Sequence, residues 1–213
     1  MRLRKDLEGH VRGVLKCLGV RMPGVNKGRL RQGFRDQLAV AGQTDPVLKI
    51  IADGFIVIHE TLCAGAGALD KDLLCVARES ALCRRLMTIP GVGPIVALSF
   101  TALVDDASRF RKSADVGAFL GLTPRRYQSG EIDYSGRISK CGDVQMRGLL
   151  FEAATCLIRL VKRFSPLKSW AVRLAARKGF KKAAVATARK MAVLMLTLWK
   201  NETEFCWKGN TTT

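Results

Sequence analysis

The chain has 213 residues, 48% of them hydrophobic, and its 36 Lys and Arg residues outnumber its 18 Asp and Glu residues. This length and hydrophobic content allow a folded core and exclude a disordered polymer. The large positive charge predicts a polyanionic partner, with nucleic acid as the first candidate. Between Ser108 and Lys190 there are 19 basic and 5 acidic residues, so we expect the binding surface in the C-terminal half.

Cysteine and histidine usage indicates a reduced protein without a structural metal. The seven cysteines are odd in number, contain no C-x-x-C pair and follow no apolar signal segment, which predicts a cytoplasmic location. The two histidines form no Cys/His spacing typical of zinc. The apolar stretch from Met191 to Trp199 is far shorter than the roughly 20 residues of a membrane span, so we expect a soluble protein without a membrane partner.

The N-terminal residues predict a helical arm. An apolar stripe with steps of three and four residues predicts a helix from Leu3 to Leu18, which Gly19 closes. The segment 21–43, which contains Pro23, is expected to be a connector with a short helix around Leu30–Ala39. Asp45-Pro46 then begins a long periodic run to Val76, in which a kink would fall at Gly65 and Gly67. This helix is either an ordinary bundle helix or part of a dimerising coiled arm.

Short helices separated by Gly- and Pro-marked turns are expected from Ser80 onward. Two-residue alternation is confined to the region Tyr127–Ile138, which is expected to be a loop or a small hairpin. The fold class is therefore mainly α, with a helical arm in residues 1–80, a helical domain in 81–205 and a tail in 206–213. The expected helices are Ala81–Thr88, Pro94–Val104, Ala114–Leu120, Val144–Lys162, Pro166–Lys178 and Lys181–Lys200.

The turn Ile89-Pro90-Gly91-Val92-Gly93-Pro94 is the first motif suited to nucleic acid. Gly91 and Gly93 allow a tight turn without side chains, so backbone N–H groups and the start of the next helix can face a phosphate oxygen. Such a contact positions DNA without reading its sequence. The pattern is that of a helix-hairpin-helix element; the alternative is a purely structural turn.

The second motif places a serine in a basic segment. A serine hydroxyl is a weak nucleophile at neutral pH, so phosphoryl transfer to it requires cations around the phosphate. Arg125 and Arg126 come just before Ser129, and Arg137 and Lys140 lie within reach if the segment folds back. By spacing alone, Ser129 is a nucleophile or a bystander in a basic loop, and the bystander is the commoner case.

Four runs make the sequence recognisable: I-P-G-V-G-P, D-D-x-S-R-F-R, G-L-T-P-R-R-Y-Q-S-G and G-R-I-S-K-C-G-D. With the runs Arg147–Ala154 and Lys181–Lys190, they closely resemble the C-terminal domain of the insertion-sequence transposases of the IS-one-ten family, relatives of the pilin-gene invertases. The N-terminal helices resemble the central coiled arm of that family. The resemblance therefore covers essentially the whole chain.

The resemblance implies cut-and-join recombination of DNA guided by a structured RNA that the element encodes. In that family, the serine of the R-R-Y-x-S-G motif is the proposed nucleophile that becomes linked to a DNA phosphate. Ser129 matches that position, whereas Ser135 and Ser139 lie outside the motif. The residues expected to contact nucleic acid are Gly91, Gly93, Arg125, Arg126, Arg137, Lys140 and Arg147.

One departure from the family concerns its metal site. Complete members begin with a RuvC-like domain in which four acidic residues hold divalent metal, and we expect that domain to precede Met1. Residues 1–213 are themselves expected to bind no cofactor, and Asp105 and Asp106 resemble a helix cap. Without the metal, the transferring phosphate loses its strongest stabiliser. A truncated chain that binds nucleic acid but does not recombine it alone is therefore expected.

The sequence thus predicts a DNA-binding, serine-bearing part of an insertion-sequence transposase, which takes part in transposition and recombination once an acidic domain completes it. The alternative is a non-catalytic remnant that binds DNA or RNA. A ribosome-associated basic protein would explain the charge but not the motifs. The expected partners are DNA, a guide RNA encoded by the element, and a second copy of the chain through the helical arm.

Overall fold

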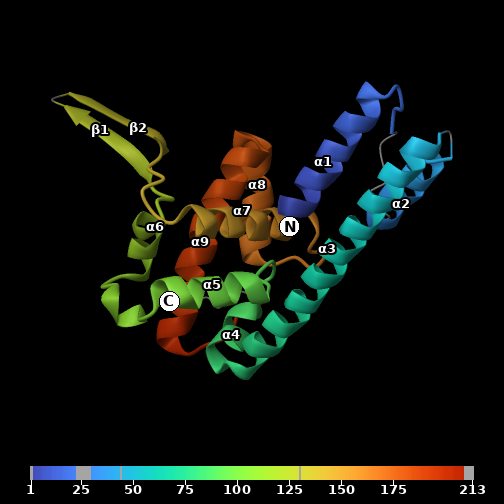
Figure 1. The fold of residues 1–213 in the computed structure, drawn as a ribbon. Coiled ribbons are helices and arrows are strands. Elements are labelled where there is room, and N and C mark those ends of the chain that lie inside the picture. The colour runs from blue at the N-terminus through green and yellow to red at the C-terminus, as the bar shows by residue number, and fades with distance from the viewer. Residues whose placement is uncertain (1, 23–29, 44, 130, 209–213) are drawn as a thin grey trace. The chain divides into compact units, whose positions relative to one another are not determined.

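The protein is described by a computed structural model that covers residues 2–22, 30–43, 45–129 and 131–208. The expected mainly α class is confirmed, because helices make up most of the described chain (Figure 1). Contacts divide the chain into two compact units, Met1–Asp72 and Leu73–Thr213. The boundary expected from the sequence, between residues 80 and 81, follows the end of helix α3 (Pro46–Glu79), which runs from the first unit into the second.

The first unit consists of α1 (Arg2–Cys17), α2 (Leu30–Ala41) and the first part of α3. Its core confirms the apolar stripe of the first helix, since Val11 and Leu15 are buried against Phe34 and Leu38 of α2. Asp45 accepts a hydrogen bond from the Val47 N–H at 2.7 Å and so caps α3. The short helix expected around Leu30–Ala39 is confirmed as α2, whereas residues 23–29 of the expected connector, including Pro23, lie outside the described residues.

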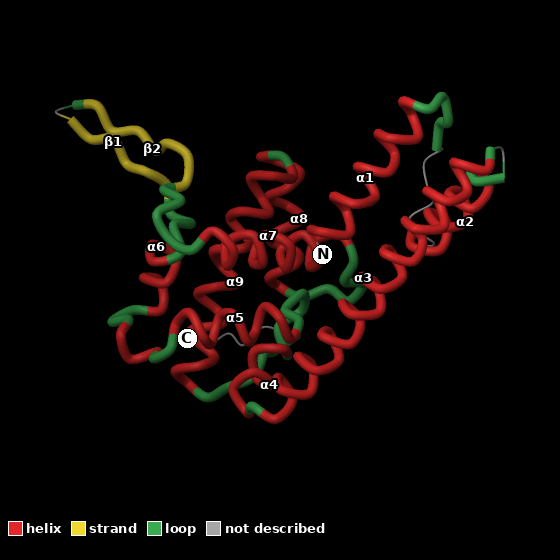
Figure 2. Tube along the Cα trace, viewed as in Figure 1, coloured by secondary structure: helices red, strands yellow, loops and turns green. Residues whose placement is uncertain are grey.

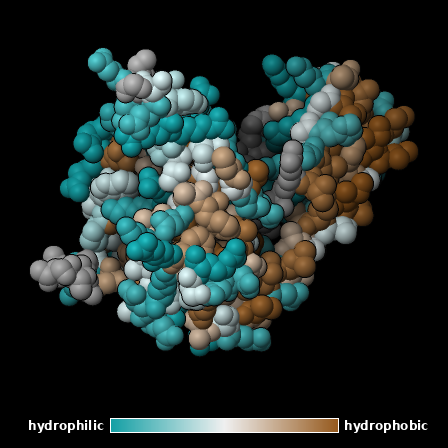
Figure 3. All heavy atoms as spheres, turned by 90° about the vertical axis from the view of Figure 1, so that its left-hand side faces the viewer, coloured by the Kyte–Doolittle hydropathy of each residue, from teal (hydrophilic) through white to brown (hydrophobic). Residues whose placement is uncertain are grey.

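Helix α3 continues without interruption through Gly65 and Gly67. Several large apolar side chains on it are exposed: Val47, Ile50, Val57, Ile58 and Leu69. At 100° per residue these positions fall within about one third of the helix circumference, so they form one apolar stripe. Figure 3 shows hydrophobic residues gathered on this part of the molecule.

The second unit contains short helices and one two-stranded antiparallel sheet (Figure 2). In chain order, after the end of α3, its elements are α4 (Ala81–Met87), α5 (Pro94–Val104), the 3-10 helices η2 (Ala107–Arg109) and η3 (Ser113–Asp115), α6 (Val116–Phe119), β1 (Pro124–Ser129), β2 (Ile132–Ile138), α7 (Val144–Arg159), α8 (Pro166–Lys178) and α9 (Phe180–Asn201).

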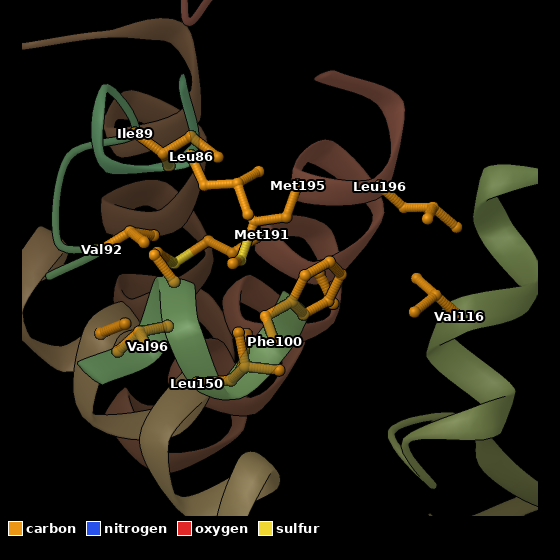
Figure 4. Packing of buried hydrophobic residues seen from close by; sticks show 14 of the residues in the cluster. Leu86, Ile89, Val92, Val96, Phe100, Val116, Leu150, Met191, Met195 and Leu196 are labelled. Carbon is orange, nitrogen blue, oxygen red and sulfur yellow. The ribbon is translucent and has the colours of Figure 1, made fainter. Parts of the chain in front are cut away.

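Helix α9 is the centre of this unit and packs against α4, α6, α7 and α8. Ala184, Ala188 and Ala192 are fully buried, and small side chains allow neighbouring helices to approach closely. Between these helices, Met191 and Met195 meet Phe100 of α5 and Leu150 of α7, as Figure 4 shows. The core therefore holds together helices that are distant in the sequence.

Most helix boundaries agree with the sequence-based prediction to within a few residues. Two regions differ. The helix expected for Val144–Lys162 ends at Arg159, and the one expected for Ala114–Leu120 is split into η3 and the short α6. Within the described ranges, no helix combines the length and the hydropathy that a membrane crossing requires.

Candidate nucleic-acid interface

Strands β1 and β2 project from the helices of the second unit, and Ser129 lies at the outer end of β1 (Figure 1). Every side chain of β1 is exposed, including that of Ser129. In the antiparallel register Ser129 is opposite Ile132, while Pro124 is opposite Ile138 at the base of the strands. The serine hydroxyl is therefore accessible to a large substrate. Gly130, which follows it, lies outside the described residues.

The two faces of the strand pair carry different chemistry. Tyr127 and Tyr134 are opposite each other and stack, with ring centroids 4.8 Å apart and an interplanar angle of 16°. Because strand side chains alternate between faces, Ser129 shares the face of Tyr127. Arg126 belongs to the other face, where its Nε and Nη2 donate to the Asp133 carboxylate at 2.9 and 2.6 Å.

This bidentate ion pair engages the Arg126 guanidinium. The hydrogen bond from Arg126 lowers the pKa of Asp133 below its ordinary value, and the same bond raises the pKa of Arg126. Both groups are therefore charged at neutral pH and compensate each other. The Asp133 carboxylate therefore offsets part of the positive field of Arg126.

The other predicted cations of this segment lie at the base of the strands. Arg125 donates from Nη2 to the Ser139 carbonyl oxygen at 3.2 Å, and the Lys140 N–H bonds to the Gly121 carbonyl oxygen at 3.0 Å. Arg137 is exposed on β2, one residue before its end. With about 3.3 Å per strand residue, Ser129 is roughly 15 Å from this base. The segment folds back as expected, but the cations gather at the base of the strands and Ser129 lies away from them.

Two backbone segments, residues 120–124 and 138–142, join the strands to the helices. They are closely packed, and we call them the neck. A Cβ on Gly142 would lie 2.1 Å from the Phe119 carbonyl oxygen, and one on Gly121 would lie 2.6 Å from the Cys141 nitrogen. Arg147 of α7 donates to the carbonyl oxygens of Gly142 at 2.5 Å and Leu120 at 3.2 Å. Arg147, predicted to contact nucleic acid, therefore holds the two backbone segments of the neck together.

The turn between α4 and α5 contains the two predicted glycines in different environments. Gly91 has φ 94°, and a Cβ there would lie 2.5 Å from the Ala153 carbonyl oxygen of α7. Gly93 caps α5 with an extended backbone, and a Cβ there would have open space around it. Gly91 thus has a packing role, whereas Gly93 leaves the start of α5 accessible.

Asp105 and Asp106, which the sequence predicts to be a helix cap, serve as caps. The Asp106 carboxylate accepts from the Ser108 N–H at 2.8 Å and caps η2, and bonding from the Ser108 side chain lowers the pKa of Asp106. Asp105 follows α5 as its C-terminal cap. Among the described residues, no group of three or more His, Cys, Asp or Glu side chains is arranged to hold a metal ion.

Sequence reasoning did not single out the exposed lysines Lys178, Lys181 and Lys182 as binding residues. They flank the junction of α8 and α9. The signal that identifies this region is the absence of Asp and Glu between Glu152 and Glu202, a stretch with twelve Lys and Arg residues.

Comparison with known proteins gives a consistent result. Residues 83–168 match the family model described as Transposase IS116/IS110/IS902 family. The chain is 39% identical over 142 residues to the transposase for insertion sequence element IS1111A of Coxiella burnetii (strain RSA 493 / Nine Mile phase I), which covers 66% of this chain and 39% of that protein. It is 32% identical over 132 residues to the transposase for insertion sequence element IS1328 of Yersinia enterocolitica. This match covers 62% of this chain and 40% of that protein. The match spans about two fifths of each relative.

Proposed function

We propose that this chain, which is related to the transposases of the IS116/IS110/IS902 family, is the DNA-binding and serine-bearing part of an insertion-sequence transposase. The observation that carries the proposal is the position of Ser129. It lies in the matched region, in R-R-Y-Q-S-G, and is exposed at the outer end of a strand pair whose base is held by Arg147. A serine presented in this way can reach a phosphate in a DNA backbone.

The proposed chemistry is transfer of a phosphoryl group to serine. The Ser129 Oγ attacks the phosphorus of a phosphodiester and forms a phosphoserine bond. One bond from phosphorus to a deoxyribose oxygen breaks, that oxygen takes up a proton, and the serine proton passes to a base or to water. The number of phosphate ester bonds is unchanged, so no external energy source is required and the step is reversible.

The surroundings of Ser129 indicate what else the reaction needs. Arg126 is paired with Asp133, and Arg125 and Lys140 lie at the base of the strands. The cations that stabilise the negative charge of the transferring phosphate must therefore come from other groups. The described residues do not fit a metal site. We infer that an acidic, metal-binding domain completes the site, and that DNA and a guide RNA encoded by the element are bound in the same assembly.

The decisive experiment tests for a covalent protein–DNA adduct. The chain is mixed with the acidic domain of a relative as a separate polypeptide, Mg²⁺, the guide RNA and end-labelled element DNA. An adduct is expected with the unchanged chain and with Ser139→Ala, because only the backbone oxygen of Ser139 is used by Arg125. No adduct is expected with Ser129→Ala. An adduct that persists in Ser129→Ala would exclude Ser129 as the nucleophile.

A second candidate function is that of a non-catalytic protein that binds DNA or RNA. The separation of Ser129 from the cations at the base of the strands favours it. In this case the chain binds nucleic acid with strong salt dependence, forms no adduct in the assay above, and competes with an intact transposase for the element DNA. Recombination measured with and without the acidic domain separates the two candidates.

Self-association through the arm is part of the proposal. The exposed apolar stripe of α3, which includes Ile50 and Val57, is a surface that a second copy of the same helix could cover. Light scattering coupled to size-exclusion chromatography should give a dimer or higher oligomer, and Ile50→Glu with Val57→Glu should give a monomer. A monomer before substitution would exclude this role.

A further inference from the structure

Exposed cations gather at the junction of α8 and α9, which Figure 2 shows as a short loop between two helices. Helix α8 ends at Lys178 and α9 begins at Phe180, so four basic residues lie within six positions of the chain. We name this group the α8–α9 corner: Arg177, Lys178, Lys181 and Lys182, all of which are exposed.

Tertiary packing adds a fifth cation. The Arg159 guanidinium, at the end of α7, lies 3.9 Å from the ring centroid of Phe180. It reaches the α8–α9 corner from a helix that begins far earlier in the sequence. Because Phe180 is covered by Arg159, and Trp170 farther back in α8 is covered by Lys190 at 4.5 Å, these rings are not free platforms for unpaired bases.

The corner carries a high density of positive charge. The chain carries no Asp or Glu between Glu152 and Glu202. In the described part of the chain, the cations of the corner form no ion pair with a carboxylate. This contrasts with Arg126, which Asp133 neutralises. A cluster of this kind repels itself and attracts polyanions.

Two of the lysines also occupy positions that oppose the dipole of their helix. Lys181 and Lys182 lie in the first turn of the 22-residue α9, which contains no acidic residue in that turn and whose cap Gly179 supplies no side-chain hydrogen bond. The start of a helix carries partial positive charge and unpaired N–H groups, so cations there reduce stability. The same positive charges favour a bound anion.

We propose that the α8–α9 corner is a second nucleic-acid contact, which binds the phosphates of a duplex through point charges without reading bases. It rests on the proposed function in that nucleic acid is the partner, but it is independent of Ser129 and its chemistry. The covered aromatic rings favour a duplex over stacked single-stranded bases. DNA and RNA duplexes share this phosphate chemistry, and separate binding assays distinguish them.

The test compares two triple variants of the full chain with equal loss of charge. The corner variant is Lys178→Gln, Lys181→Gln and Lys182→Gln. The control is Lys5→Gln, Lys49→Gln and Lys71→Gln, three exposed lysines of the first unit. Affinity for a labelled DNA duplex and a labelled RNA duplex is measured by fluorescence anisotropy over a range of salt concentrations.

In the corner variant, we expect affinity to fall at least about tenfold near 0.1 M salt, and the slope of log affinity against log salt to decrease by about 2 to 3. A loss on DNA alone, on RNA alone or on both identifies the duplex that the corner binds. If the corner variant and the control have the same affinity and the same salt dependence, the proposed role of the α8–α9 corner is overturned, while the proposed function stands. Absence of binding by the unchanged chain would overturn both.

Thermal stability provides a second measurement. Removal of Lys181 and Lys182 relieves repulsion at the start of α9, so the double variant Lys181→Gln, Lys182→Gln should unfold at a higher temperature than the unchanged chain. A variant that is more stable than the unchanged chain but binds the duplex more weakly indicates that these lysines serve ligand binding at the expense of stability. A lower unfolding temperature would show that these lysines serve the fold and would overturn the proposal.

Discussion

The Asp133 carboxylate accepts two hydrogen bonds from the Arg126 guanidinium, at 2.6 and 2.9 Å, on the face of the strand pair opposite Ser129. An arginine that the sequence assigns to phosphate binding is thus already neutralised by an acid of the next strand. The Arg126 guanidinium is therefore less available to a phosphate than its place in the sequence suggests, and this can be tested directly.

Asp133→Asn should strengthen DNA binding, because it removes one negative charge and frees Arg126 for a phosphate. We expect the slope of log affinity against log salt to become steeper by about one. Asp70→Asn, an exposed acid in the first unit, is the control with the same change in charge. If both variants bind DNA equally, Arg126 has no access to the phosphates.

The same pair gives a defined pH dependence. Because the folded-state pKa of Asp133 is lowered, its contribution to stability is present above the ordinary pKa of 3.8 and is lost as pH falls through the lowered value. The difference in the free energy of unfolding between the unchanged chain and Asp133→Asn should therefore be constant between about pH 6 and pH 8 and should shrink as the pH falls below 3.8. A difference that does not shrink at low pH would show that the pair is not formed.

The two glycines of the turn after α4 should respond differently to alanine. Gly91→Ala forces a Cβ onto the Ala153 carbonyl oxygen and strains a positive φ, so we expect a loss of about 3 kcal/mol in the free energy of unfolding. Gly93→Ala meets open space and should keep the stability within about 0.5 kcal/mol. Only Gly93 therefore tests DNA contact, through the affinity of Gly93→Arg compared with Gly93→Glu. Equal affinities would leave this turn with a structural role.

Arg147→Met should loosen the neck below the strands. The substitution keeps the aliphatic packing but removes the donors to the Gly142 and Leu120 carbonyl oxygens, with an expected cost of about 2 kcal/mol. Amide hydrogen exchange should increase in residues 120–124 and 138–142, while exchange in α9 stays slow. If exchange rises equally throughout the second unit, Arg147 supports the whole fold and not the neck in particular.

His59→Ala should destabilise the first unit selectively. The buried His59 ring lies 3.1 Å from Glu8 of α1 and packs on Phe34 of α2 at 4.9 Å, so its removal leaves a cavity and takes away one of the two partners of the Glu8 carboxylate. We expect a loss of about 2 to 3 kcal/mol, seen as faster hydrogen exchange in α1 and α2. The exposed His10 provides the control, His10→Ala, which should have little effect. Similar exchange in the two variants would contradict the role of His59.

Much of the fold is local and was predictable. The stripe from Leu3 to Leu18, the cap Asp45 and the helix starting at Pro94 depend on residues within one or two turns of each other, and the structure confirms them. The charge excess and the motif around Ser129 are also properties of the linear chain. The function of Ser129 and of the predicted contact residues stays a prediction.

Contacts between distant residues decided the rest. Spacing cannot show that Arg126 is paired with Asp133, that Gly91 presses against Ala153, or that Arg159 reaches Phe180. Helix periodicity and charge are read from neighbours along the chain, and the sequence by itself determined these. Which cations are available to phosphate depends on packing through space, so only the tertiary structure could separate the paired arginine of the strands from the exposed lysines at the junction of α8 and α9.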